Sequence, residues 1–131
     1  MLFVGRDIAK RKEENNIFNY NEQVQIYFED ASSGKLEKKE IVLSENEVKN
    51  LVNQLAAYSS KLSTNTLKKE FLCWYTIKLN DEITIQIDAE FNYSDSDKLT
   101  YMYVIQHNVE PVTLYGTFID STIVADLNIK H

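Results

Sequence analysis

The chain has 131 residues, of which 44% are hydrophobic and 26% are charged, and its formal net charge is −6. This length fits one domain, and three glycines and one proline exclude collagen-like and low-complexity classes. We therefore expect a single domain over residues 1–131, with residues 1–16 forming a short charged N-terminal arm or helix.

The first predicted element is a β-hairpin. Residues 24–29 alternate apolar and polar side chains, and this period of two, with β-branched and aromatic residues, is typical of a half-buried strand. Residues 30–34 predict a turn, in which the glycine is free to take a positive φ. Residues 36–43 predict the returning strand. Its charged start at residues 37–40 suits the exposed edge of a sheet, because charge blocks unwanted pairing.

A helix is predicted directly after the hairpin. Ser44 and Glu47 match a capping box, in which each side chain accepts a hydrogen bond from the backbone of the other residue. Apolar side chains then recur at steps of three and four, which places them in one stripe. We therefore expect one long amphipathic helix over residues 45–62, ended by the polar residues 63–66.

The remainder of the chain predicts antiparallel strands, because segments rich in β-branched and aromatic residues alternate with turn-forming residues. The five predicted strands are 71–79, 83–91, 100–107, 112–119 and 122–129. Residues 83–91 alternate most clearly, with one face for the core and one for water. Gly116 inside a predicted strand indicates a bulge or a close backbone approach.

These elements predict an α+β fold in the order β-β-α-β-β-β-β-β. We expect an antiparallel, curved sheet of six to seven strands packed on the one helix, since the apolar stripe must be buried. One helix cannot cover both faces of so wide a sheet. Either the sheet curls around the helix, or one face stays partly open and binds something.

The charge is unevenly distributed along the chain. Residues 1–80 have a net charge of +1, whereas residues 81–131 hold nine Asp and Glu against two lysines, a net charge of −7. The acidic half would repel a phosphate backbone, and two arginines are few for a protein that reads nucleic acid. We therefore expect no direct binding of nucleic acid, and we expect this field to attract a basic protein partner.

No motif for catalysis, a metal or a cofactor stands out, so we expect a protein that is not an enzyme. Cys73 is the only cysteine, and its apolar surroundings predict a small buried side chain rather than a nucleophile. His107 and His131 lack the partners that a dyad or a metal site needs. The Asp-x-Asp of residues 95–97 lacks the glycine and the distant glutamate of a calcium loop.

The best candidate for a binding surface is an acidic segment with neighbouring tyrosines, because tyrosine combines a large apolar body with a polar tip and is enriched in interfaces. Asp88 and Glu90 share the polar face of one predicted strand, and this segment follows them. The residues predicted to contact a partner are Asp88, Glu90, Tyr93, Asp95, Asp97, Tyr101 and Tyr103.

These features favour a small acidic protein that binds and inhibits a basic partner, for example a nuclease, in the manner of an immunity protein or a phage-encoded inhibitor. Two alternatives remain open. One is a small-ligand carrier with an apolar pocket between sheet and helix, lined by Trp74, Phe91 and Phe118. The other is an accessory subunit that forms an oligomer, for example a homodimer.

The location and the source are predicted from simpler signals. No secretory signal and no apolar run of about 20 residues is found, so we expect a cytoplasmic protein without membrane association. Lys, Asn and Ile number 12 each, and their AT-rich codons suggest a bacterial or phage genome of low GC content.

Overall fold

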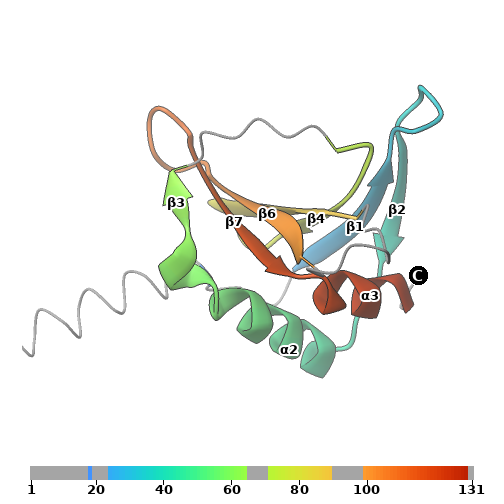
Figure 1. Ribbon diagram of the computed structural model, residues 1–131, viewed down its shortest axis with the longest axis horizontal. Coiled ribbons are helices and arrows are strands. Elements are labelled where there is room, and N and C mark those ends of the chain that lie inside the picture. Colours follow the sequence, from blue (N-terminus) through green and yellow to red (C-terminus); the bar gives the residue numbers. More distant parts are fainter. Residues whose placement is uncertain (1–17, 19–23, 65–70, 90–98, 130–131) are drawn as a thin grey trace, which may run out of the picture.

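The computed structural model describes Phe18 and residues 24–64, 71–89 and 99–129 (Figure 1). The predicted N-terminal arm or helix at residues 1–16 lies outside the described residues. The elements in chain order are β1 (Gln25–Asp30), β2 (Glu37–Ile41), α2 (Glu45–Ala56), the 3-10 helix η1 (Ser59–Lys61), β3 (Ser63–Thr64), β4 (Cys73–Lys78), β5 (Ile83–Asp88), β6 (Leu99–Gln106), β7 (Thr113–Asp120) and α3 (Thr122–Ile129).

The seven strands form one open sheet in the order β2-β1-β4-β5-β6-β7-β3, and every neighbouring pair is antiparallel. The predicted α+β class with an antiparallel sheet is therefore confirmed. The charged strand β2 lies at one edge, where its four charged residues are exposed as expected. Both helices lie beneath the same face of the sheet (Figure 1).

The predicted single long helix over residues 45–62 is wrong, although its start is confirmed. The N–H of Ser44 donates to Glu47 Oε1 at 3.0 Å, and the N–H of Glu47 donates to Ser44 Oγ at 3.2 Å. The helix α2 then ends early, because the chain turns through η1 to reach the sheet. There Ser63 pairs with Gly116 of β7, so β3 becomes the second edge of the sheet.

The last element is a helix, α3, so the strand predicted at residues 122–129 is wrong. Its buried side chains, spaced along one helical face, are Ile123, Val124 and Leu127. The Asp120 carboxylate accepts the N–H of Thr122 at 2.9 Å and satisfies one of the amides left open at a helix start. Burial of this apolar face outweighs the strand preference of β-branched residues.

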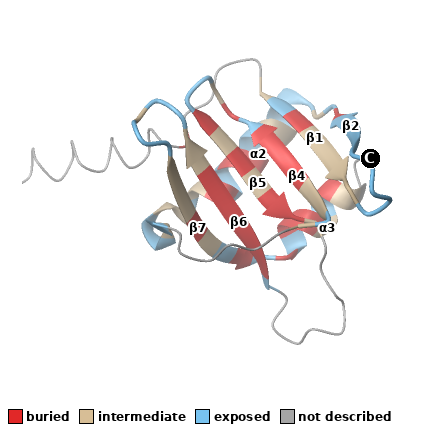
Figure 2. Cartoon of the chain, turned by 90° about the horizontal axis from the view of Figure 1, so that it is seen from above, coloured by how far each residue is buried: buried red, intermediate tan, exposed pale blue. Residues whose placement is uncertain are grey.

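The core fills the space between the helices and one face of the sheet. On β5, Ile83, Ile85 and Ile87 all point into it, as the alternation in the sequence predicts. Leu55 of α2 and Val124 of α3 are fully buried against this face. Figure 2 shows that the buried residues concentrate on the central strands, with both helices behind them.

Gly116 makes room for a side chain and does not introduce a bulge. The pairing of β6 with β7 runs without interruption from Leu99–Asp120 to Gln106–Thr113. A Cβ atom at Gly116 would lie 2.8 Å from Cε1 of Tyr101, closer than real contacts allow. The glycine therefore lets the ring of Tyr101 lie against β7.

Candidate protein-binding surface

The residues predicted to contact a partner fall into two groups. Outside the described residues, in the segment between β5 and β6, lie Glu90, Tyr93, Asp95 and Asp97. The structure describes the other three, Asp88, Tyr101 and Tyr103. These come from the two strands that this segment joins, so its ends are held beside each other by the pairing of β5 with β6.

Asp88, Tyr101 and Tyr103 share the face of the sheet that points away from α2 and α3. Residues paired across antiparallel strands point to the same side. Asp88 pairs with Trp74, Tyr103 pairs with Gln86, and Tyr101 pairs with Phe118. We call this side the second face. Neither described helix covers it, as the view from above shows (Figure 2).

Four aromatic side chains line up on the second face, and we call them the aromatic row. The ring centroids of Phe71 and Tyr103 are 5.4 Å apart, and those of Tyr103 and Tyr101 are 4.9 Å apart. Phe118 completes the row, at 5.0 Å from Tyr101 and with its ring at 88° to it. These separations and the edge-to-face geometry are favourable for aromatic pairs. The row therefore orients Phe118 on a fixed support.

The inner part of this surface is buried, and only one end of the row is exposed. Asp88, Tyr101 and Tyr103 are 3%, 4% and 6% exposed, so the strand at residues 83–88 does not present a wholly solvated polar face. By contrast, Phe118 is 51% exposed and Leu99, on the same face, is 53% exposed. Burial, with a smaller contribution from Tyr103, raises the pKa of the Tyr101 hydroxyl, which stays protonated at neutral pH.

On the second face, the carboxylate of Glu29 joins β1 to β4. Glu29 Oε2 accepts the Trp74 indole N–H at 2.6 Å and the Thr76 hydroxyl at 2.5 Å. The next residue, Asp30, accepts hydrogen bonds through its carboxylate from Ser32 and from the Cys73 thiol. The Ser32 bonds, with a smaller contribution from the thiol, lower the pKa of this carboxyl. These bonds lock the strands together and engage the carboxylates within the protein.

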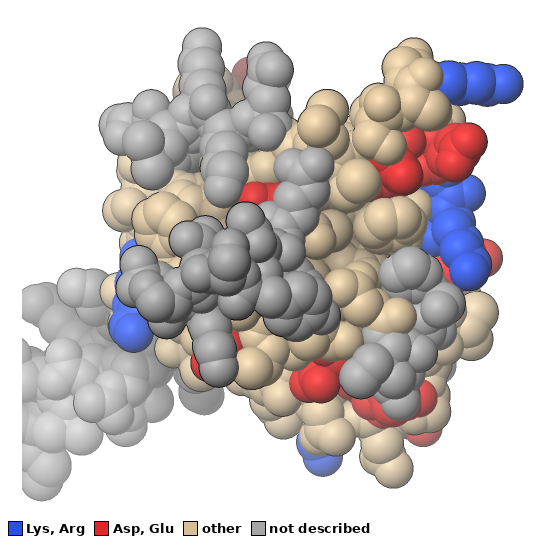
Figure 3. Space-filling model, turned by 45° about the vertical axis from the view of Figure 1, so that its right-hand side comes forward, with Lys and Arg blue, Asp and Glu red and all other residues tan. Residues whose placement is uncertain are grey.

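The charge asymmetry of the sequence is also found among the described residues. From residue 81 to residue 129 they include six carboxylates and no Lys or Arg. The described lysines are Lys35, Lys38, Lys39, Lys49, Lys61 and Lys78. Several of them gather at the β2 edge, interspersed with acidic side chains (Figure 3). The net negative charge of this half of the sequence is therefore retained among the described residues.

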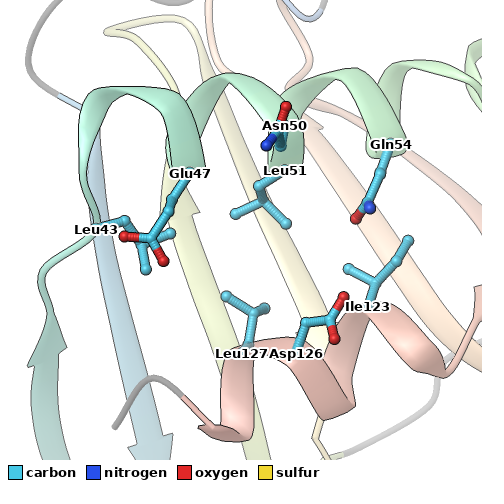
Figure 4. A pocket seen from close by; sticks show the side chains of 8 residues that line it. All are labelled: Leu43, Glu47, Asn50, Leu51, Gln54, Ile123, Asp126 and Leu127. Atoms are coloured by element: carbon cyan, nitrogen blue, oxygen red, sulfur yellow. The ribbon is translucent and has the colours of Figure 1, made fainter.

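A concave site also exists, but it lies between the helices. A groove of about 380 Å³ separates α2 from α3, and the eight side chains that line it are shown in Figure 4. It differs from the apolar pocket expected between sheet and helix. Trp74 and Phe118 lie on the second face and cannot line such a pocket, and Phe91 lies outside the described residues.

Sequence reasoning missed three members of this surface. Phe71 belongs to the predicted strand 71–79, but it lies outside β4, against Tyr103. Phe118 was placed in a pocket, and Leu99 was placed before a strand. The tyrosines and β-branched residues of β6 predict a strand from the sequence alone. Its register against β7, which brings Leu99 and Phe118 to one side, is not a local signal.

No family model, no curated protein and no solved structure matches this chain. Within the part of the chain that the structure describes, no group of three His, Cys, Asp or Glu side chains is placed to hold a metal ion. None of the described helices has the length and apolarity that crossing a bilayer requires. The geometry of the surfaces is thus the basis for any proposal on function.

Proposed function

We propose that this protein is a small binding protein without catalytic activity that docks a basic protein partner on the exposed end of the aromatic row. The observation that carries the proposal is Phe118, half-exposed yet held edge-on by the buried ring of Tyr101. Exposed Leu99 extends the apolar surface beside it. Aromatic anchors on a rigid support supply most of the binding energy in many interfaces, because little side-chain freedom is lost on binding.

Electrostatics support a basic partner. Asp120 is exposed and lies on the same face as Phe118, two residues along β7. The predicted contact residues Glu90, Asp95 and Asp97 belong to the segment of the sequence between β5 and β6. Carboxylates around an apolar centre accelerate encounter with a basic protein and select against acidic ones. Such a partner, for example a nuclease, would be inhibited where its basic surface is covered, in the manner of an immunity protein or a phage-encoded inhibitor.

Removal of the anchor is expected to weaken the complex. The partner is first captured from a lysate of the source on tagged protein, eluted with a salt gradient and purified. With Phe118→Ala, we expect the affinity measured by calorimetry to fall by roughly 10- to 100-fold, because a central aromatic anchor is lost. The matched control is Leu36→Ala. Leu36 is 54% exposed but lies in the turn between β1 and β2, so the affinity should not change.

Equal affinity of the Phe118→Ala and Leu36→Ala proteins would contradict the proposed surface. Light scattering on the unbound protein distinguishes partner binding from the alternative in which this chain forms an oligomer. A concentration-dependent increase in mass that Phe118→Ala abolishes would assign the same surface to contact between copies of this chain.

Charge reversal in the segment between β5 and β6 is expected to slow association. The triple variant Glu90→Lys, Asp95→Lys and Asp97→Lys removes the predicted acidic contacts and leaves the buried Asp88 in place. We expect the association rate with the purified partner to fall at least tenfold at low salt, and the difference from the unchanged protein to shrink as salt rises.

Stopped-flow mixing at several salt concentrations measures this effect. An association rate that the triple variant leaves unchanged would sink the electrostatic part of the proposal. Nucleic acid that is captured both by the unchanged protein and by the triple variant would contradict the proposal of a basic protein partner. A phosphate backbone should bind the triple variant more tightly, because the variant is less acidic.

A further inference from the structure

The strand β2 forms one edge of the sheet, and among the described residues no strand pairs with its outer side (Figure 1). Its charged residues 37–40 are exposed, and so are the two apolar residues that flank the strand. Leu36, directly before β2, is 54% exposed, and Val42, directly after it, is 83% exposed. An edge strand turns backbone N–H and C=O groups outward, and these groups can pair with a further strand.

The sequence along this edge is self-complementary on the second face. The Lys38 ammonium lies over the ring of Tyr27, 4.0 Å from its centroid, and Glu40 pairs with Tyr27 across the strands, so both charges belong to this face. At steps of two, the flanking apolar residues extend the series, which reads apolar, positive, negative, apolar. An antiparallel copy of the series reads in reverse. Each charge would then meet its opposite, and each apolar residue would meet an apolar one.

We propose that two copies of this chain pair through β2 in antiparallel orientation, with Lys39 of each copy at the two-fold axis. In this register Lys38 lies directly opposite Glu40 of the second copy. Leu36 lies opposite Val42 of the second copy, and symmetry makes each of these contacts occur twice. Opposite charges and apolar pairs that face each other across antiparallel strands stabilise the pairing. The two sheets join into one continuous sheet, with both second faces on the same side.

The register decides whether this edge can pair, because charge on an edge strand usually prevents pairing. A shift by one residue in either direction would join the second face of one copy to the helix face of the other. A shift by two residues would place a charged side chain opposite Leu36 or Val42. In the proposed register, the one pair of like charges directly opposed is Lys39 with Lys39 of the second copy. Each of these lysines has Glu37 of the other copy as a diagonal neighbour, within reach of a long side chain.

This inference goes beyond the proposed function. The strand β2 lies at one edge of the sheet, whereas the aromatic row extends to β7 near the other edge, and the two surfaces share no residue. A dimer of this kind leaves Phe118 of both copies exposed. It would therefore present two docking surfaces on the same side of one continuous sheet, and a partner with two binding segments would be held more tightly than by one copy.

The test exchanges the two charges between the copies. In Lys38→Glu the new carboxylate faces Glu40 of the second copy, and in Glu40→Lys the new ammonium faces Lys38, so each variant alone opposes like charges twice. An equimolar mixture of the two variants restores two pairs of opposite charge. Sedimentation velocity over a series of protein concentrations measures the association.

We expect the unchanged protein to form a weak dimer, because one edge strand buries less surface than a standard interface. Each variant alone should dimerise about tenfold more weakly, since two pairs of opposite charge become two pairs of like charge. The mixture should associate as tightly as the unchanged protein. Both substitutions are at exposed positions, so circular dichroism should show an unchanged fold.

The matched control is a mixture of Lys49→Glu and Asp81→Lys, which makes the same charge changes at exposed positions outside β2. This mixture and each of its components should dimerise as the unchanged protein does. A monomer at every concentration, for the unchanged protein and for the mixture of β2 variants, would overturn the inference. Equal association of Lys38→Glu, Glu40→Lys and the unchanged protein would also overturn it. Dimerisation that Phe118→Ala abolishes would overturn it in favour of contact through the aromatic row.

Discussion

Replacement of Asp88 by lysine is expected to destabilise the fold by about 3–5 kcal/mol, as is typical when an uncompensated charge is buried. Asp88 is 3% exposed and pairs directly with Trp74 on the neighbouring strand β4. The Thr100 hydroxyl donates to its backbone carbonyl at 2.8 Å, so both the side chain and the backbone lie in closely packed surroundings. Urea unfolding followed by circular dichroism measures the change.

The comparison for this prediction is Asp81→Lys, which makes the same charge change in the exposed turn between β4 and β5. We expect that variant to change the free energy of unfolding by less than about 0.5 kcal/mol. Equal effects of the two variants would contradict a buried Asp88. The result also bears on partner binding, because loss of binding in an Asp88→Lys protein would report unfolding rather than a lost contact.

Replacement of Tyr75 by alanine is expected to cost about 3–5 kcal/mol of stability, since a large buried ring is removed from the core. Tyr75 is fully buried on β4, and its ring centroid is 5.3 Å from that of Phe28. Its hydroxyl is hydrogen-bonded to Asn128 Oδ1 of α3, which ties the last helix to the centre of the sheet. Chemical denaturation gives the loss. The matched variant Tyr27→Ala, half-buried on β1, should cost much less.

The contribution of the Tyr75 hydroxyl to stability can be measured apart from that of the ring, with the Tyr75→Phe variant and by changing the pH. Burial raises the pKa of this hydroxyl strongly above its ordinary value. The unfolded tyrosine therefore ionises first, and its contribution to stability is present below pH 10 and is lost as the pH rises above that value. We expect Tyr75→Phe to flatten the fall in stability between pH 9.5 and about 11. An identical alkaline profile for both proteins would contradict a buried, protonated Tyr75.

The second face and the groove between the two helices have different physical origins. The second face is a product of strand register, since the aromatic row joins β6, β7 and Phe71. The groove is a product of two helices that bury their apolar stripes on the same face of the sheet and leave acidic side chains at their seam. The two described helices lie on one face of the sheet, and the exposed end of the aromatic row lies on the other.

Local patterns in the sequence were sufficient for much of the fold. The alternation at residues 83–88 has one apolar face, and a strand is the conformation that buries it. The capping box at Ser44 begins a helix because its hydrogen bonds close within four residues. The charged residues 37–40 identified an edge strand, since four exposed charges do not fit inside a sheet. In each case the physical reason acts between neighbours in the chain.

Only the tertiary structure decided the elements whose partners are distant in sequence. Residues 122–129 contain β-branched residues that favour a strand, yet they form α3 because the sheet offers Ile123 and Leu127 a place to be buried. Asp88 is buried across from Trp74 of the neighbouring strand, and the side of the sheet on which Phe118 lies depends on the register of β7. Burial is a property of contacts across the fold, and a local pattern does not contain them.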